Sequence, residues 1–218
     1  MKVYHFVPAQ YGLENIRRRR LKIATIPDLN DPFELLCVDL SDHDLRKRML
    51  KWKDEMGKSF GLVCFSRTWR NPVQWSHYAD RHRGLALGFE LSNEFAIPVT
   101  YDKLRSKAEA HELLGGQPLS GATVRKFIST KFAHWRYEQE VRGFLALDER
   151  DEESGLYFYG FSKEMKLVEV IIGAESEIRR DEVRSALGDL SLSTSIRNAR
   201  LAFKEYGVTT QNDSSLWA

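Results

Sequence analysis

The chain has 218 residues, of which 42% are hydrophobic and 29% charged, the composition of an ordinary globular protein with one large or two small domains. Its net charge of +2 gives no overall signal for binding nucleic acid or a membrane surface. The sequence shows neither the apolar core of a signal peptide nor an apolar run long enough to cross a bilayer, so we expect a cytoplasmic protein with no membrane partner.

The first part of the chain predicts a strand over residues 2–7, a short helix marked by Leu13 and Ile16, and a second strand over residues 21–25. Four consecutive arginines, at positions 17–20, follow the helical pattern. Cations at a helix end stabilise the negative end of the helix dipole, and we prefer this interpretation to a nucleic-acid-binding patch.

A turn rich in carboxylates and amides follows at residues 27–34. Asn and Asp before proline favour a turn, and Pro32 keeps Asp31 out of the helical region. Such a turn is able to line a pocket, which makes Asn30 a candidate binding residue. It is equally able to be a plain loop whose side chains satisfy its own backbone.

The best-marked helix begins at Ser41, which forms a capping box with Asp44, and ends at Gly57. One face is apolar at helical spacing and consists of Leu45, Met49, Trp52 and Met56. Lysines and arginines occupy the other face. They indicate a solvated surface, with a target-binding surface as the alternative.

Residues 60–66 and 85–91 form two strands with little polar interruption, which predicts a central place in the sheet. Between them lies a predicted helix over residues 74–82, which carries Trp75, Ser76, His77 and Tyr78. The histidines of the chain show no zinc-site spacing, so we expect no metal. Cys37 and Cys64 lie in apolar runs, which favours a reduced interior over a disulfide.

The second half of the chain continues the mixture of strands and helices. We predict strands over residues 98–101, 143–147, 155–161, 167–173 and 200–210, and helices over residues 103–114, 120–135 and 175–187. Runs of strands with inserted helices predict an α+β fold with a mixed or antiparallel central sheet. We expect a single domain over residues 1–210 and a frayed tail at 211–218. The chain lacks the glycine-rich dinucleotide motif, the P-loop and the nucleophile elbow.

Residues 137–142, Tyr-Glu-Gln-Glu-Val-Arg, open the strand that follows the predicted helix. Alternation along a strand places Glu138, Glu140 and Arg142 on one face. Ionised carboxylates rarely lie close together without partners or a chemical role. The stretch therefore marks a candidate site, with an edge strand bearing a solvated charged face as the alternative.

Three blocks of the chain stand out together: residues 30–34 (Asn-Asp-Pro-Phe-Glu), 75–79 (Trp-Ser-His-Tyr-Ala) and 137–142. They match the N-D-P-F-E, W-x-H-Y-A and Y-E-x-E-x-R motifs of a widespread bacterial family of unknown function. The chain resembles that family down to about Gly173, and the resemblance implies no activity by itself.

A weaker resemblance is to the ADP-ribosyltransferase fold. Its members place a His or Arg on the first strand, an aromatic residue or Ser on a central strand before a helix, and a Glu at the start of a later strand. His5, Ser66 and Glu140 match these places. Phe65 stands where the histidine branch usually has Tyr, so the chain mixes features of the histidine and arginine branches.

This second resemblance implies roles in cleaving the bond between nicotinamide and ribose in NAD, which would be the substrate. Glu140 would stabilise the oxocarbenium-like centre through the ribose 2′-hydroxyl, and Glu138 would orient or activate the acceptor as a general base. Tyr78 or Trp75 would stack on the nicotinamide ring, and His5 would hydrogen-bond a ribose hydroxyl. Each of these side chains also has a purely structural alternative.

Arg142 would keep Glu140 ionised or contact the pyrophosphate. The residues expected to bind NAD are Asn30, Ser66, Trp75, Tyr78, His5 and Arg142. The preferred hypothesis is an ADP-ribosyltransferase-like enzyme, a toxin or a phage-defence effector, that modifies a protein or nucleic acid or hydrolyses NAD. The alternative is a non-enzymatic module of a bacterial defence or stress system that binds nucleic acid or a protein through its basic surfaces.

Overall fold

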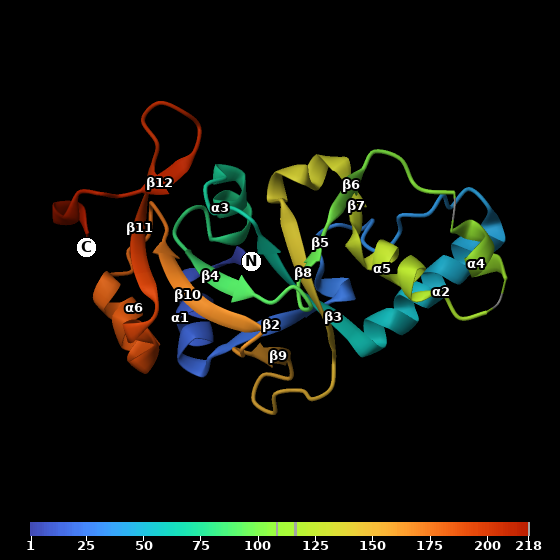
Figure 1. Ribbon diagram of the computed structural model, residues 1–218, viewed down its shortest axis with the longest axis horizontal. Helices are drawn as coiled ribbons and strands as arrows, with labels where there is room; N and C mark the ends of the chain where they lie inside the picture. The colour runs from blue at the N-terminus through green and yellow to red at the C-terminus, as the bar shows by residue number, and fades with distance from the viewer. Residues whose placement is uncertain (108, 116, 218) are drawn as a thin grey trace.

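The strands of this protein form a ten-stranded, mostly antiparallel mixed sheet and a separate two-stranded sheet within the described residues, 1–107, 109–115 and 117–217 of a computed structural model (Figure 1). The strands are β1 (Lys2–Val7), β2 (Arg20–Thr25), β3 (Phe60–Ser66), β4 (Leu85–Leu91), β5 (Ile97–Pro98), β6 (Thr100–Asp102), β7 (Thr130–Phe132), β8 (Glu140–Ala146), β9 (Tyr157–Gly160), β10 (Met165–Ile172), β11 (Ser195–Leu201) and β12 (Val208–Thr210). With its helices, the chain is an α+β protein.

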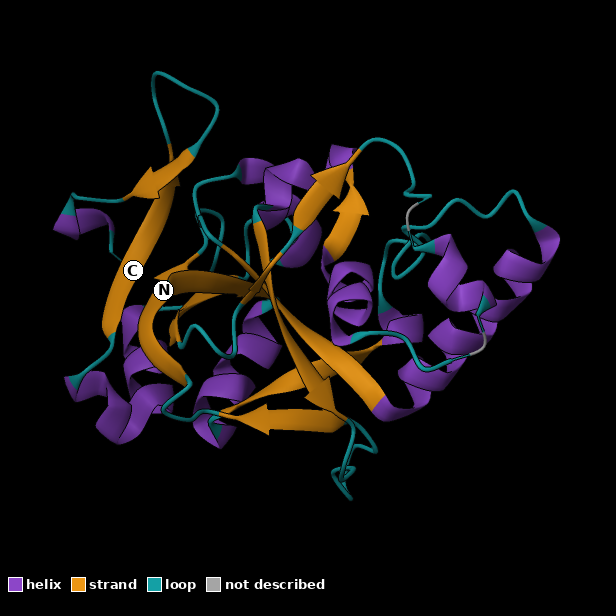
Figure 2. Cartoon of the chain, turned by 45° about the vertical axis from the view of Figure 1, so that its right-hand side comes forward, coloured by secondary structure: helices purple, strands orange, loops and turns teal. Residues whose placement is uncertain are grey.

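The helices lie around the large sheet rather than in strict alternation with its strands (Figure 2). The α-helices are α1 (Ala9–Arg18), α2 (His43–Ser59), α3 (Pro72–Tyr78), α4 (Ala110–Leu114), α5 (Gly121–Ser129) and α6 (Arg180–Leu187). Short 3₁₀ segments are η1 (Ile26–Asp28), η2 (Ala133–Glu138), η3 (Gly188–Leu192) and η4 (Ser214–Leu216). No helix in the described part of the chain has the length and apolar character needed to cross a membrane.

The first strand lies in the middle of the large sheet, antiparallel to β4 on one side and to β3 on the other. β4 pairs with β1 along its whole length, whereas β3 meets β1 at one position, with Tyr4 opposite Ser66. β3 then pairs with β8, and this ladder ends with Ser66 opposite Glu140. The sheet therefore opens where β1 and β3 part, and the candidate site lies at this opening.

Successive side chains of β1 point to opposite faces of the sheet and so belong to two different hydrophobic cores. Val3 and Val7 belong to the largest core, which includes apolar side chains of α1 and α6. Tyr4 and Phe6 pack with the core around Trp75 of α3. The side chains of α2, α4 and α5 form a further core beside the sheet. The opening between β1 and β3 is thus held by packed layers, which gives the site a rigid frame.

Several helices are shorter than the sequence pattern predicts. The helix predicted to begin at Ser120 does so, with the Ser120 hydroxyl accepting from a backbone N–H, but it ends at Ser129 because β7 and η2 follow. α4 covers only the last part of the helix predicted over residues 103–114, and α6 begins later than residue 175. α2 is capped by Asp42 rather than Ser41 and continues to Ser59.

The C-terminal region differs most from the prediction. The strand predicted over residues 200–210 is a hairpin of β11 and β12, and β11 runs parallel to β10. In the tail predicted to fray, the indole of Trp217 donates to the carbonyl of Gln211 at 2.9 Å. The guanidinium of Arg180 lies 4.2 Å from the centre of the Trp217 ring. Ala108, within the predicted helix 103–114, and Ala218, in the predicted tail, lie outside the described residues.

A left-handed turn follows α3. Asp80, Arg81 and His82 have φ angles of 42°, 54° and 71°. In this region the Cβ of an L-residue crowds the backbone, at a cost of about 1–2 kcal/mol per residue. The turn is held against the end of β10, where the N–H of Glu175 donates to the His82 carbonyl at 3.1 Å. It explains why the helix predicted over residues 74–82 stops at Tyr78.

Arg81→Gly is expected to be more stable than Arg81→Ala by about 1 kcal/mol, since glycine has no Cβ to crowd the left-handed backbone. Arg81 is exposed, so both variants lose the same surface side chain. Urea denaturation measures the difference. The same pair at Lys51, an exposed position inside α2, is the control and should show the opposite order. Equal stability of the two Arg81 variants would contradict the expectation.

Candidate active site

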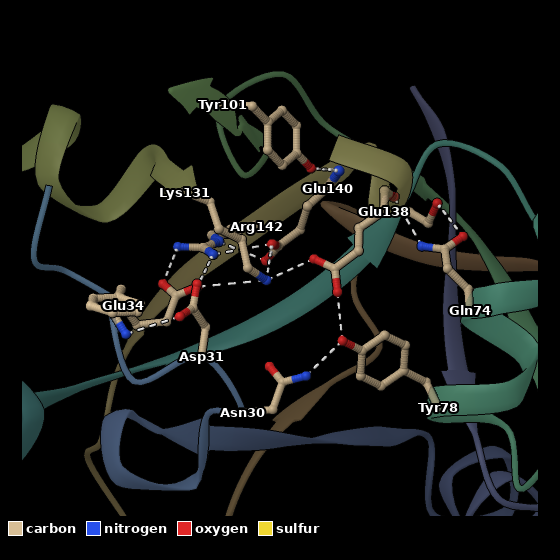
Figure 3. A network of polar contacts seen from close by, with 12 residues as sticks. Asn30, Asp31, Glu34, Gln74, Tyr78, Tyr101, Lys131, Glu138, Glu140 and Arg142 are labelled. Atoms are coloured by element: carbon tan, nitrogen blue, oxygen red, sulfur yellow. Dashed lines mark hydrogen bonds and ion pairs between the residues drawn. The ribbon is translucent and has the colours of Figure 1, made fainter. Parts of the chain in front are cut away.

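A cavity of about 220 Å³ lies where β1 and β3 part. Its walls come from β1, the loop after β2, β3 with α3, and the segment from β7 to β8 (Figure 3). The lining residues are Tyr4, His5, Phe6, Asp28, Leu29, Asn30, Glu34, Cys64, Phe65, Ser66, Gln74, Tyr78, Lys131, Glu138, Glu140 and Arg142. All of the site residues predicted from the sequence except Trp75 are among them.

Arg142 holds two walls of the cavity together. Its side chain is 1% exposed and donates from Nη1 and Nη2 to the two carboxylate oxygens of Glu34, at 2.8 and 2.6 Å. Nε and Nη2 also donate to Glu140, at 2.6 and 3.1 Å. Such paired contacts fix geometry as well as charge, so Arg142 ties the loop that carries Glu34 to β8.

Lys131 joins the same carboxylates from β7. Its Nζ donates to Glu138 at 2.7 Å and to Glu140 at 3.1 Å, and it lies 3.6 Å from Glu34. Together with Arg142 these four residues form a buried ion cluster with one more carboxylate than cation. An excess carboxylate away from water is costly unless it takes up a proton or a positively charged partner.

The pKa values of the two catalytic candidates in this ion cluster, Glu138 and Glu140, are shifted in opposite directions. Burial raises the pKa of Glu138, although the charge of Lys131 acts against the shift. Burial also acts to raise the pKa of Glu140, but the charges of Arg142 and Lys131 outweigh it and bring the pKa down to about 2. Carboxyl pairs whose environments separate their pKa values are typical of acid–base sites.

The chain reaches these two positions by a turn rather than by a continuous strand. Glu138 is the last residue of η2, Gln139 has a φ of 46°, and β8 begins at Glu140. The prediction that Glu138 lies on the strand is therefore wrong. The left-handed residue Gln139 turns the backbone, and both carboxylates still face the cavity (Figure 3).

Tyr78 places an aromatic ring beside Glu138. Its hydroxyl donates to Glu138 at 2.5 Å and accepts from the amide of Asn30 at 2.7 Å. Burial raises the pKa of Tyr78, and the nearby carboxylate of Glu138 raises it further. Tyr78 therefore stays protonated at neutral pH and supplies a hydrogen bond as well as a ring.

His5 presents a neutral imidazole to the cavity. Its Nδ1 lies 2.9 Å from the carbonyl oxygen of Cys64, which only accepts, so Nδ1 carries the proton. Burial lowers the pKa of His5. Nε2 then keeps its lone pair, and it has no hydrogen-bond partner among the described residues. His5 is thus able to accept a hydrogen bond from a ligand hydroxyl.

The last two predicted residues differ, because Ser66 lines the cavity and Trp75 lies behind it. The Ser66 hydroxyl donates to Gln74, whose amide donates at 3.0 Å to the backbone carbonyl of Glu138. Trp75 is fully buried, its ring lies 5.2 Å from that of Phe6, and it does not line the cavity. Burial of Trp75 leaves Tyr78 as the residue for the stacking role expected of either aromatic ring.

Glu34 and Lys131 belong to the site, although the sequence pattern did not single them out for a role. Glu34 is the last residue of the first motif block, whereas Lys131 lies outside the three blocks, six positions before the third. Tyr101 was also missed, and its hydroxyl accepts from the backbone N–H of Glu140 at 2.7 Å. Glu34 and Tyr101 lie 108 and 39 positions from their partners in β8, and Lys131 lies 7 and 9 positions from Glu138 and Glu140.

No group of three or more His, Cys, Asp or Glu side chains in the described residues is arranged to hold a metal ion. Cys37 and Cys64 are free thiols. Comparison of the chain with protein-family models, with curated proteins and with solved structures found no match in any of the three. The arguments for a function therefore come from the residues and geometry of the cavity.

Proposed function

We propose that this protein cleaves NAD as an ADP-ribosyltransferase-like enzyme, a toxin or phage-defence effector that transfers ADP-ribose to a macromolecule or to water. The observation that carries the proposal is the meeting of His5, Tyr78, Glu138 and Glu140 in one cavity, with the pKa values of the two glutamates shifted in opposite directions. A fixed negative charge and a titrating carboxyl are the two groups that this reaction requires.

Glu140 supplies the fixed negative charge. As the bond between ribose and nicotinamide breaks, positive charge develops on the ribose ring, and a carboxylate at the 2′-hydroxyl stabilises it. Arg142 and Lys131 hold Glu140 ionised, and a carboxylate has lone pairs for about four hydrogen bonds. The two cations fill three of these positions and the Cys64 thiol, a weak donor, fills the fourth, so a ligand hydroxyl binds Glu140 by displacing the thiol.

Glu138 is the proposed general base. The attacking hydroxyl or nitrogen bonds to the anomeric carbon, its proton passes to Glu138, and the bonding electrons of the broken bond leave with neutral nicotinamide. Lys131 and Tyr78 each bond one oxygen of Glu138 and so fix its orientation. A base must lie within hydrogen-bond reach of the proton that it takes.

The remaining cavity residues suit a flat ring and a sugar. Tyr78 and Phe65 offer aromatic surfaces, and Nε2 of His5 is able to accept from a ribose hydroxyl. About 220 Å³ is below the common range for whole-ligand pockets, roughly 300–1,000 Å³. The cavity therefore suits the nicotinamide riboside end of NAD, with the adenosine end outside it.

The rate of NAD cleavage is expected to rise with pH as Glu138 loses its proton. Because burial raises its pKa, the midpoint should lie above the ordinary glutamate value of 4.5. Glu138→Gln should remove this acid limb and lower the rate by about 10²–10⁴-fold. Initial rates of nicotinamide release across the pH range measure both effects. A Glu138→Gln variant with an unchanged profile would exclude Glu138 as the base.

Stability should show the same titration with a defined sign. The folded protein holds the Glu138 proton more tightly than the unfolded chain does. The protonated carboxyl of Glu138 therefore makes its full contribution to the free energy of unfolding at pH values below the pKa of the unfolded chain. It is lost as the pH rises through the folded pKa. Relative to the wild type, Glu138→Gln should therefore gain stability as the pH rises above 4.5, measured by urea denaturation at a series of pH values.

A further inference from the structure

An open groove of about 800 Å³ adjoins the cavity, and Tyr78 lines both. One wall is formed by the start of the chain around α1, and the other by the end of α3. Tyr11, Arg17, His77 and Asp80 contribute polar or aromatic side chains to it. Because the cavity takes only one end of a dinucleotide, the groove offers the nearest surface for a second reactant.

The groove contains the unpaired member of the arginine tract. Three of the four arginines form ion pairs with carboxylates on other segments: Arg18 with Glu153, Arg19 with Asp189 and Arg20 with Asp151. Arg17 has no ion pair among the described residues and lines the groove. Asp80, the acidic residue that lines the groove, is paired with Arg83 at 3.1 Å. The free charge that the groove presents is therefore positive.

Aromatic rings lie along the groove, and further rings continue beyond it toward the chain segment before β8. Tyr11 is 55% exposed and lines the groove. The ring of His77 lies 5.9 Å from that of Tyr78 and 6.3 Å from that of Tyr137. The ring of Tyr137 in turn lies 6.0 Å from that of Trp135. Exposed rings beside an unpaired cation are able to bind unstacked bases and a phosphate together.

We propose that this groove binds single-stranded nucleic acid and presents a base or sugar hydroxyl to the cavity at Tyr78. Arg17 contacts a phosphate, and Tyr11 and His77 stack on bases. The role of the nucleic acid as ADP-ribose acceptor rests on the proposed function. In that reaction the nucleophile of the nucleic acid loses its proton to Glu138 and bonds to the anomeric carbon as nicotinamide leaves. Binding itself needs no NAD.

The test is the change in fluorescence anisotropy of a labelled single-stranded oligonucleotide of about 12 nucleotides. Arg17→Ala should weaken binding about fivefold to tenfold and reduce the salt dependence by about one phosphate contact. Arg18→Ala removes the same charge from the paired neighbour and is the matched control, expected to bind nearly as the wild type does. Tyr11→Leu should weaken binding about tenfold, and Tyr11→Phe should restore it.

A duplex of the same sequence should bind more weakly, because its bases are not free to stack on the rings. No binding, equal losses in Arg17→Ala and Arg18→Ala, or equal affinity for the duplex would each overturn the proposal. Glu140→Gln separates it from the proposed function, since this variant should lose nicotinamide release and still bind the oligonucleotide. NAD cleavage without oligonucleotide binding would leave the proposed function standing and exclude this acceptor.

Discussion

Glu140→Gln is expected to lower nicotinamide release by about 10²–10³-fold, equivalent to about 2.7–4 kcal/mol of the reaction barrier. Glutamine keeps the shape of the side chain and removes the negative charge that stabilises the developing cation. The charge is available at every pH of interest, because Arg142 and Lys131 bring the pKa of Glu140 to about 2. Single-turnover release of nicotinamide from NAD by the purified protein measures the loss directly.

The matched control for this variant is Glu169→Gln. Glu169 is also a buried glutamate, 2% exposed, and it pairs with Lys2 and Arg197, but it does not line the cavity. Its substitution should cost stability and leave nicotinamide release near the wild-type level. A folded Glu140→Gln variant that retained full activity would contradict the role of Glu140. A wild-type protein that neither binds NAD by calorimetry nor releases nicotinamide would remove the proposed function altogether.

Arg142→Met should lower the free energy of unfolding by about 3–5 kcal/mol at neutral pH. Methionine fills much of the space but leaves Glu34 and Glu140 buried without the guanidinium that bonds both. Urea denaturation, with the ellipticity of the sheet and helices as the signal, measures the loss. Lys51→Met on the exposed face of α2 is the control and should change stability by only a few tenths of a kcal/mol.

The loss should depend on pH in a known direction. The folded pKa of Glu140 is about 2, below its ordinary value of 4.5, so the stability that this carboxylate contributes is present above pH 4.5. It is lost as the pH falls toward 2. The difference between wild type and Arg142→Met should therefore shrink over that range. Adding Glu34→Gln and Glu140→Gln to Arg142→Met should recover part of the loss, and failure to do so would argue against uncompensated charge as its cause.

Only some of the strands were predicted with the right bounds, namely those whose residues are mostly apolar; β7 was predicted as helix, and the single strand predicted over residues 200–210 is a hairpin. Residues 2–7, 60–66 and 85–91 have the bounds that the sequence indicates. Such runs are buried on both faces of a sheet and leave few alternatives. The mixed α+β class follows from the same pattern.

The helices were predicted less well, because competing tertiary contacts ended them. After Ser129 the chain enters β7, which pairs with β6 rather than continuing the apolar stripe toward Trp135. After Tyr78 the left-handed turn replaces the last predicted helical turn. Neither pairing nor a positive φ at a non-glycine residue leaves a local sequence signal.

The site was predicted in part for a similar reason. The spacing of Glu138, Glu140 and Arg142 indicated a shared face, and these side chains do face one cavity. The partners that set their charge states, Glu34 and Lys131, come from other segments, and no local pattern connects them. Trp75 shares a motif with Tyr78, but the sequence did not show which ring is buried and which lines the cavity.

The contact between Glu34 and Arg142 spans 108 positions of the chain. At a synthesis rate of about 5–20 residues per second, the ribosome makes Arg142 roughly 5–20 s after Glu34. Likewise, the central strand β1 is able to form its hydrogen-bonded ladder with β4 only after β4 has been synthesised. A nascent chain that has not yet exposed Arg142 has no assembled site. The cavity with its ion cluster is therefore able to form only after most of the chain has been synthesised.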